Sequence, residues 1–164
     1  MLFMALSGQP VDIQFNLKQD LIDRTFVEPP LVVDQQTSLH EALVLLKQHR
    51  CGHLLICEDG KLAGIFTERD FLYLIANQAT LEQPIGNVMT INVDFLSPED
   101  TVGTSIARMS EGGYRHIPVA DIDGHPVGVS RVSGILRYLV EFFPSVVYNL
   151  PPQPHHSTKD REGA

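Results

Sequence analysis

The residues best suited to binding chemistry lie in one segment, residues 64–70, which reads Gly-Ile-Phe-Thr-Glu-Arg-Asp. The segment separates two apolar runs, which places it at a junction between a strand and a helix. Thr67 is the predicted N-cap of that helix, and the free N–H groups of a helix N-terminus bind phosphate. The Asp70 carboxylate can accept two hydrogen bonds from a ribose cis-diol. Gly64 would let the backbone approach a ligand closely.

The same segment also has a purely structural interpretation. Thr-x-x-Asp before an apolar run is the pattern of a capping box, in which the two side chains only satisfy the backbone at a helix end. Taken alone, such a match is usually no more than a cap. The surrounding sequence decides between the two interpretations.

That surrounding sequence repeats itself at a spacing of 64 residues, which slips to 63 around the pair His53 and His116. Matching positions include a helix start, a turn and a strand: Thr37 with Thr101, Asp59-Gly60 with Asp123-Gly124, and Gly64-Ile65 with Gly128-Val129. An internal repeat is the sequence signature of two similar structural units. The chain is therefore expected to consist of two similar halves.

Each copy is predicted to follow the order β-α-β-β-α. The first copy has expected strands over 31–33, 54–57 and 62–66, a helix capped by Thr37 and a helix over 68–76. The second has expected strands over 93–96, 117–120 and 126–130, a helix capped by Ser97, Asp100 or Thr101, and a helix over 132–142. Because each half exposes much apolar surface, the two halves should pair face to face, giving an α+β fold with pseudo-two-fold symmetry.

The predicted boundaries are an N-terminal extension over 1–24, repeats over 25–84 and 85–144, and a Pro-rich tail over 145–164. Within the extension, residues 11–17 alternate apolar and polar side chains, which is typical of a strand. Residues 18–26 are equally compatible with a helix. The tail is expected to be extended or flexible.

The repeat, with its segments 64–70 and 113–119, resembles the CBS domain, and the tandem arrangement resembles a stand-alone CBS pair, or Bateman module. The family motif Gly-apolar-x-Thr/Ser-x-x-Asp/Asn is matched at every position of residues 64–70. The resemblance covers roughly residues 25–144. It implies a regulatory module without catalytic activity, which binds AMP, ADP, ATP or a related adenosyl ligand in a cleft shared by the two repeats.

The resemblance also implies which residues form the cleft. The first repeat contributes the motif residues, and the second contributes basic residues and a segment beside the base. Carried over, the site residues are Gly64, Ile65, Thr67, Asp70, Asn92, Val93, Asp94, Arg115 and His116. Arg115 offers planar donors for phosphate. Mg²⁺ is a further candidate where the ligand is a di- or triphosphate.

The second cleft departs from the motif. Arg131 stands where Thr67 stands, and Gly134 stands where Asp70 stands. Opposite them, Gly52-His53 replaces Arg115-His116. We therefore expect one competent nucleotide site per chain, with Arg131 either binding phosphate in another way or lying on the surface.

Composition narrows the function classes. A formal net charge of −8 disfavours general nucleic-acid binding, and no apolar run is long enough to span a membrane. The start of the chain makes a poor export signal, and Cys51 and Cys57 are too few for a disulfide scaffold, so a cytoplasmic location is expected. The spacing of Cys51, His53 and Cys57 matches no common zinc pattern, and no metal site is predicted.

Two alternatives remain beside the nucleotide sensor. One is a structural or protein-interaction module whose ligand sites have decayed. The other is an enzyme with Glu68, Asp70 and His116 as acid and base, which we disfavour because no nucleophile or metal set accompanies them. The resemblance also implies a homodimer through helices such as 37–48 and 68–76, and an effector protein that the sequence does not identify.

Overall fold

The structure is a computed structural model that describes residues 3–4, 10–11 and 13–144. In chain order the elements are β1 (Phe3–Met4), β2 (Pro10–Val11), α1 (Ile13–Gln19), η1 (Ile22–Thr25), β3 (Val32–Asp34), α2 (Leu39–His49), β4 (His53–Glu58), β5 (Lys61–Thr67), α3 (Glu68–Ala76), η2 (Ile85–Asn87), α4 (Val102–Gly112), β6 (His116–Ala120), β7 (Pro126–Arg131) and α5 (Val132–Phe142). The predicted tail, residues 145–164, lies outside the described residues.

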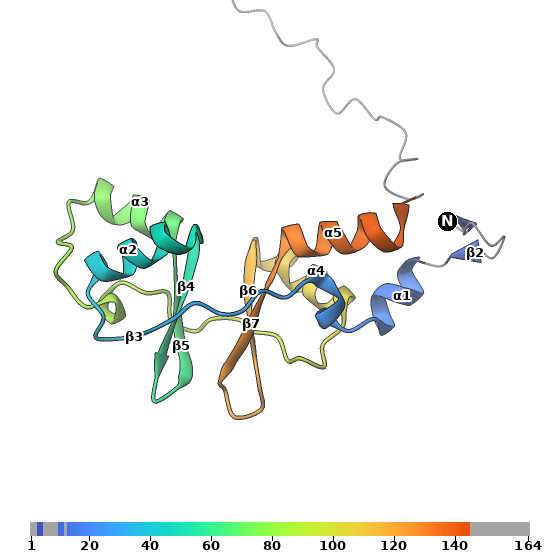
Figure 1. Ribbon diagram of the computed structural model, residues 1–164, viewed down its shortest axis with the longest axis horizontal. Coiled ribbons are helices and arrows are strands. Elements are labelled where there is room, and N and C mark those ends of the chain that lie inside the picture. The colour runs from blue at the N-terminus through green and yellow to red at the C-terminus, as the bar shows by residue number, and fades with distance from the viewer. Residues whose placement is uncertain (1–2, 5–9, 12, 145–164) are drawn as a thin grey trace, which may run out of the picture.

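The two halves lie side by side, and their hairpins, β4–β5 and β6–β7, are neighbours at the middle of the molecule (Figure 1). Each half has its own apolar core, and a third cluster joins them through Leu55, Ile65 and Val129. The hairpins also share a backbone hydrogen bond, from Leu62 N–H to the Gly124 carbonyl at 2.9 Å. These contacts confirm the predicted α+β pair.

Sheet topology differs between the halves. In the first, β3 runs parallel to β4 and β5 runs antiparallel to it, in the order β3-β4-β5. In the second, only the β6–β7 hairpin is regular, and the predicted strand over 93–96 is reduced to one bridge, Leu96 to Val119. Two backbone hydrogen bonds accompany this bridge, from Leu96 N–H to the Pro118 carbonyl at 2.8 Å and from Ala120 N–H to the Leu96 carbonyl at 2.9 Å. The residues just before it, Asp94 and Phe95, are held by the Arg108 guanidinium of α4, which binds the Asp94 carboxylate at 3.0 Å and the Phe95 carbonyl.

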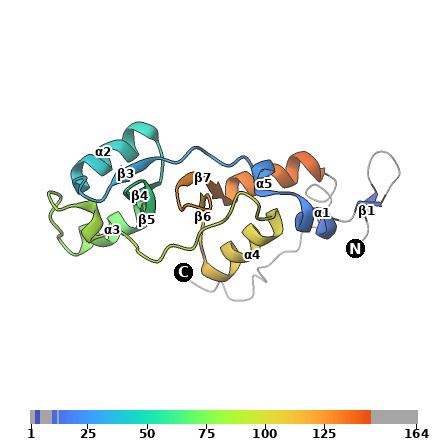
Figure 2. The same cartoon turned by 90° about the horizontal axis from the view of Figure 1, so that it is seen from below.

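The segments that lead into each half cross over to the other half. Glu28, before β3, pairs with Val129 of β7. Thr90 lies in the linker between η2 and α4 and pairs with Ile65 of β5. Figure 2 shows these two segments on opposite sides of the central hairpins. Each half is thus completed by a segment that precedes the other, which ties the two halves together.

Helix starts follow capping chemistry, with one correction. The N-cap of α2 is Ser38, not Thr37 as predicted: Ser38 forms a capping box with Glu41, whereas Thr37 N–H donates to the Asp34 carbonyl at 3.0 Å in the preceding turn. Thr101 caps α4. Thr67 caps α3 as predicted.

The strand expected over residues 11–17 is wrong beyond Val11, since α1 occupies Ile13–Gln19. Leu17 packs against Val102 and Tyr138 of the second half, and its carbonyl lies only 2.8 Å from where a Cβ on Gly103 would be. This close docking onto α4 stabilises a helix where side-chain alternation alone indicated a strand. Within the described residues, no helix combines the length and apolar character needed to cross a bilayer.

Candidate functional site

A cavity of about 270 Å³ lies between the two halves. Its lining comes from the residue before β4, from β5 and the start of α3, from the linker between η2 and α4, and from the turn between α4 and β6 with the first residue of β6: Gly52, Ile65, Thr67, Glu68, Arg69, Asp70, Thr90, Gly113, Tyr114, Arg115 and His116. A smaller cavity of about 60 Å³ shares part of that lining and adds Asn92, Val93 and Asp94. We call the two together the groove.

The groove brings together every predicted site residue except Gly64. A Cβ on Gly64 would lie 2.5 Å from Met89 Sδ and 2.9 Å from the Thr90 carbonyl oxygen. The glycine therefore permits the close approach of the linker that pairs with β5, not the approach of a ligand, which corrects the reason given for it. Gly128 serves the same purpose in the second half, where a Cβ would lie 2.3 Å from Val27 Cγ1.

Thr67 and Asp70 form a complete capping box at the start of α3. The Thr67 N–H and hydroxyl donate to Asp70 Oδ2 at 2.8 and 2.7 Å, and Asp70 N–H donates back to Thr67 Oγ1 at 3.4 Å. Asp70 Oδ1 has no hydrogen-bond partner among the residues the structure describes. The structural interpretation of the motif is therefore correct, and it leaves one carboxylate oxygen free on the side chain that lines the groove.

Residues that sequence reasoning missed add to both sides of the groove. Arg69 lines the cavity, and the sequence could have indicated this, because Arg69 follows the N-cap Thr67 by two positions and so lies in the first turn of α3. Tyr114 lines both cavities. Its ring packs closely over Gly112, where an added Cβ would lie only 2.0 Å from Tyr114 Cε2. Gly113, with φ of 65°, ends α4 in the left-handed conformation and turns the chain toward Arg115. Two guanidinium groups and an aromatic ring therefore share this cavity with Asp70.

His116 lies against the buried ring of His53, with the centroids 4.5 Å apart and the planes tilted by 34°. Burial lowers the pKa of His53 to about 4, and the charges of His116 and Arg131 act in the same direction. Burial also lowers the pKa of His116. The sequence assigned His53 to the opposite cleft, whereas the structure places it directly behind a residue of this one.

The second cleft is filled by the chain itself. A Cβ on Gly134, the counterpart of Asp70, would lie 2.2 Å from the Thr25 carbonyl oxygen. Arg131, the counterpart of Thr67, forms an ion pair with Glu28 and is only one-third exposed. Arg131 is therefore engaged in a partly buried pair, and does not simply lie on the surface. Backbone and an ion pair occupy the places that Asp70 and Thr67 hold in the groove.

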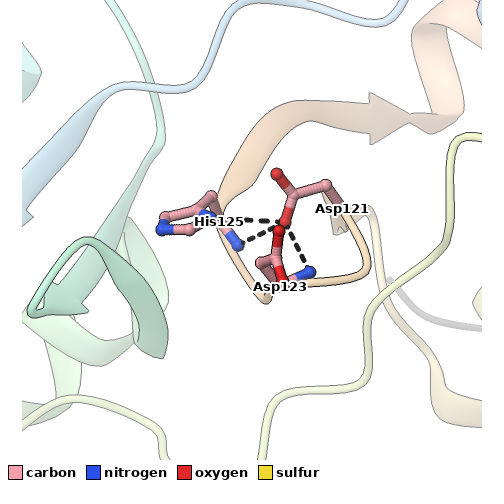
Figure 3. Close-up of side chains that lie close together, drawn as sticks. All are labelled: Asp121, Asp123 and His125. Carbon is pink, nitrogen blue, oxygen red and sulfur yellow. Dashed lines mark hydrogen bonds and ion pairs between the residues drawn. The ribbon is translucent and has the colours of Figure 1, made fainter.

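One compact group of metal-ligating side chains exists among the described residues, Asp121, Asp123 and His125, in the turn between β6 and β7 (Figure 3). Asp121 Oδ1 accepts the backbone N–H groups of Asp123 and His125 at 3.0 and 2.8 Å. These hydrogen bonds, the one from His125 first, lower the pKa of Asp121. The Asp121 carboxylate thus stabilises the hairpin turn, and we assign no metal-binding role to the three residues.

Comparisons with known proteins agree on one family. A family model for the CBS domain matches residues 20–77 and 85–141. An uncharacterized 17.7 kDa protein of Acidianus ambivalens is 26% identical over 111 residues, which cover 67% of each chain. L-aspartate semialdehyde sulfurtransferase of Methanocaldococcus jannaschii is 29% identical over 132 residues, 79% of this chain but 24% of that protein. The chain therefore spans between a quarter and two thirds of these relatives.

Solved structures include close matches over most of the chain. The CBS domain pair of protein MJ0100, in complex with 5′-methylthioadenosine and S-adenosyl-L-methionine, superposes with a TM-score of 0.68 at 28% identity, over 74% of this chain and 97% of that one. CBSX2 in complex with AMP gives a TM-score of 0.68 at 23% identity, over 75% and 98%. The protein ATU1752 of Agrobacterium tumefaciens gives 0.62 at 30% identity, over 74% and 96%.

Proposed function

The chain belongs to the CBS-domain family, and from this membership we propose that it is a regulatory module without catalytic activity that binds an adenine nucleotide or related adenosyl ligand in the groove. The observation that carries the proposal is the shared lining of one cavity by Asp70 of the first half and Arg115 of the second. A ligand held by both residues would join the two halves. Such a ligand shifts a conformational or oligomeric equilibrium by its difference in affinity for the two states.

The groove offers a partner for each part of a nucleotide. Asp70 Oδ1 would accept hydrogen bonds from the ribose hydroxyls. The phosphate would lie against Arg69 and Arg115, near the N-terminus of α3, where guanidinium groups and free N–H groups favour an anion. The base would occupy the smaller cavity beside Asn92 and Val93. Tyr114, which lines both cavities, offers an aromatic face for stacking.

The candidate ligands are AMP, ADP, ATP and S-adenosylmethionine. The domain pair of MJ0100, which is 28% identical to this chain, binds two adenosyl compounds, which supports an adenosyl ligand in general. Mg²⁺ would accompany only a di- or triphosphate. We expect one ligand per chain, because the Thr25 carbonyl and the Arg131–Glu28 pair fill the other cleft.

An enzymatic role has less support. Asp70 is held as a hydrogen-bond acceptor by Thr67, which suits binding better than proton transfer. One relative is named as a sulfurtransferase, but this chain spans only 24% of it, so its activity does not carry over. The output of the module would instead reach a separate effector protein. The free thiols of Cys51 and Cys57 fit a reducing compartment such as the cytoplasm.

A second candidate function is a ligand-free interaction module, which the filled second cleft favours. A thermal-shift panel of AMP, ADP, ATP, S-adenosylmethionine and adenosine, with GMP as the control, separates the two. A ligand at 100 times its dissociation constant stabilises the fold by about 2.7 kcal/mol. We expect at least one adenosyl compound to raise the melting temperature above the GMP control. An absence of any shift at millimolar concentration would favour the interaction module.

A further inference from the structure

We propose that His53 is a positioning residue of the groove: its buried ring fixes the ring of His116, and the pair takes up one proton, on His116, when an anionic ligand binds. The inference rests on the proposed function, because it concerns the same groove. It adds a residue that no ligand would touch and a dependence on pH that the other contacts do not imply.

The first argument is geometric. His116 lines both cavities of the groove, whereas His53 lines neither and is 2% exposed. His53 pairs with Thr67 across β4 and β5, and His116 pairs with Arg131 across β6 and β7. The two rings therefore meet where the hairpins of the two halves face each other. His53 can act on a ligand only through His116.

The second argument is that His53 has little freedom to move. Cys51 Sγ lies 3.5 Å from His53 Nδ1 and donates to the His53 carbonyl at 3.2 Å. The His116 ring packs against the same imidazole. A side chain that is buried and contacted in this way keeps one rotamer, because the surrounding core has no space for another. The fixed ring is in turn a rigid support for His116.

The third argument is the charge around the pair. The charged groups around it include the four that act on the two rings and two that line the same cavity as His116: Arg131, Glu28, Arg115, Glu68, Arg69 and Asp70. Three are cationic and three anionic, so their formal charges cancel. An added phosphate makes the surroundings negative and favours imidazolium at His116. Two imidazolium rings 4.5 Å apart would repel each other, so His53 stays neutral.

The pKa directions support this account. Burial lowers the pKa of both rings, and the pKa of His53 reaches about 4. Both rings are therefore neutral near pH 7 in the free protein. His116 is the ring that faces the groove, so a ligand phosphate acts on His116 more strongly than on His53.

The test follows the His116 ring protons by NMR as the pH is lowered, for protein alone, with saturating AMP and with saturating adenosine. The ring is observed directly because the AMP phosphate itself titrates near pH 6. We expect AMP to raise the apparent pKa of His116 and adenosine to leave it unchanged. An unchanged pKa with bound AMP would overturn the proton uptake.

Positioning is tested by calorimetry on two variants at about pH 7.5. His53→Ala removes the support, and we expect AMP affinity to fall about fivefold while adenosine affinity is unchanged. His53→Phe keeps a ring in place, and its AMP affinity should stay within about twofold of wild type. Wild-type AMP affinity in His53→Ala, or a loss above about tenfold in a folded His53→Phe, would overturn the positioning role. Failure of the wild-type protein to bind AMP or adenosine would instead defeat the proposed function.

Discussion

Asp70 combines two roles at the scale of single residues, a helix cap and a candidate ligand contact. Replacing it with alanine should cost about 1 kcal/mol of stability, because the capping box at Thr67 is lost. The same change should weaken AMP binding at least about tenfold, because the acceptor for the ribose hydroxyls is lost as well. Urea unfolding and calorimetry of Asp70→Ala measure the two effects separately.

The chain contains a matched control for that variant. Glu41 closes the same kind of capping box on Ser38, at the start of α2, and does not line the groove. Glu41→Ala should therefore lose similar stability and bind AMP as the wild type does. Equal AMP affinity in both variants would show that Asp70 is a cap and nothing more.

His53 makes stability depend on pH. Its pKa is about 4 in the fold against 6.5 for a free histidine, so between these values the unfolded chain binds more protons and stability rises with pH. Lowering the pH from about 7 to about 4.5 should thus cost about 2 kcal/mol once solvent screening is allowed for. His53→Phe should remove most of that loss. Unfolding in urea at the two pH values checks this, and parallel losses in both proteins would contradict it.

Residue types revealed part of the site and misplaced another part. The motif over residues 64–70 was enough to locate the cap of α3. The repeat aligned His53 with His116, and alignment alone assigned each to its own cleft. In the structure, His53 and His116 are equivalent positions that lie near the pseudo-two-fold axis. Equivalent residues beside such an axis lie next to each other, which is why the two rings are in contact. The slip in the repeat spacing at these two histidines did not indicate that contact.

At the scale of elements, the second cleft cannot be repaired by restoring the motif. The double variant Arg131→Thr with Gly134→Asp restores the threonine and aspartate of the motif. However, the Cβ of any residue at position 134 would lie 2.2 Å from the Thr25 carbonyl oxygen. We expect the double variant to lose about 3 kcal/mol or more and to gain no second AMP site. Urea unfolding and binding stoichiometry measure both.

The control for this variant is Gly113→Ala. Gly113 has a left-handed backbone, with φ of 65°, but a Cβ there would meet nothing within 4 Å, unlike a Cβ on Gly134. Its cost should be only about 1 kcal/mol. A stable double variant that binds two AMP molecules would show that η1 leaves the second cleft readily.

Element types were largely predictable, whereas partners were not. Asp-Gly turns and helix-forming runs indicated both hairpins and the helices α2 to α5. The crossed pairing of Glu28 with Val129 and Thr90 with Ile65 was not predicted, because similar repeats offer similar strand edges in either half. The helix α1 was also missed, since its docking on the second half is a tertiary contact.

At the scale of the whole molecule, apolar side chains remain exposed on α3 and α5, which run along the same edge of Figure 1. Leu72 and Tyr73 of α3 are 68% and 70% exposed, and Leu136 of α5 is 57% exposed. The sequence predicted a homodimer through helices such as 37–48 and 68–76, and we propose that α5 shares this surface, because pairing two chains there would cover the exposed apolar side chains of α3 and α5. Leu72→Glu with Leu136→Glu should therefore give a monomer in light scattering, with AMP binding retained.

The control for the dimer is Ile122→Glu, in the turn after β6, where the side chain is fully exposed. It adds one carboxylate, as each substitution of the double variant does, but away from both helices, and it should leave the dimer intact. A monomeric wild-type protein, or a double variant that remains dimeric, would contradict a dimer through these helices.

The most direct measurement is calorimetric titration of AMP into the wild-type protein and into Arg115→Ala, with Lys18→Ala as the control for lost charge. The account predicts one AMP per chain in the wild type and in Lys18→Ala, and at least about tenfold weaker binding in Arg115→Ala. Two AMP molecules per chain would contradict the filled second cleft. Absence of binding, or wild-type affinity in Arg115→Ala, would contradict a nucleotide site shared by the two halves.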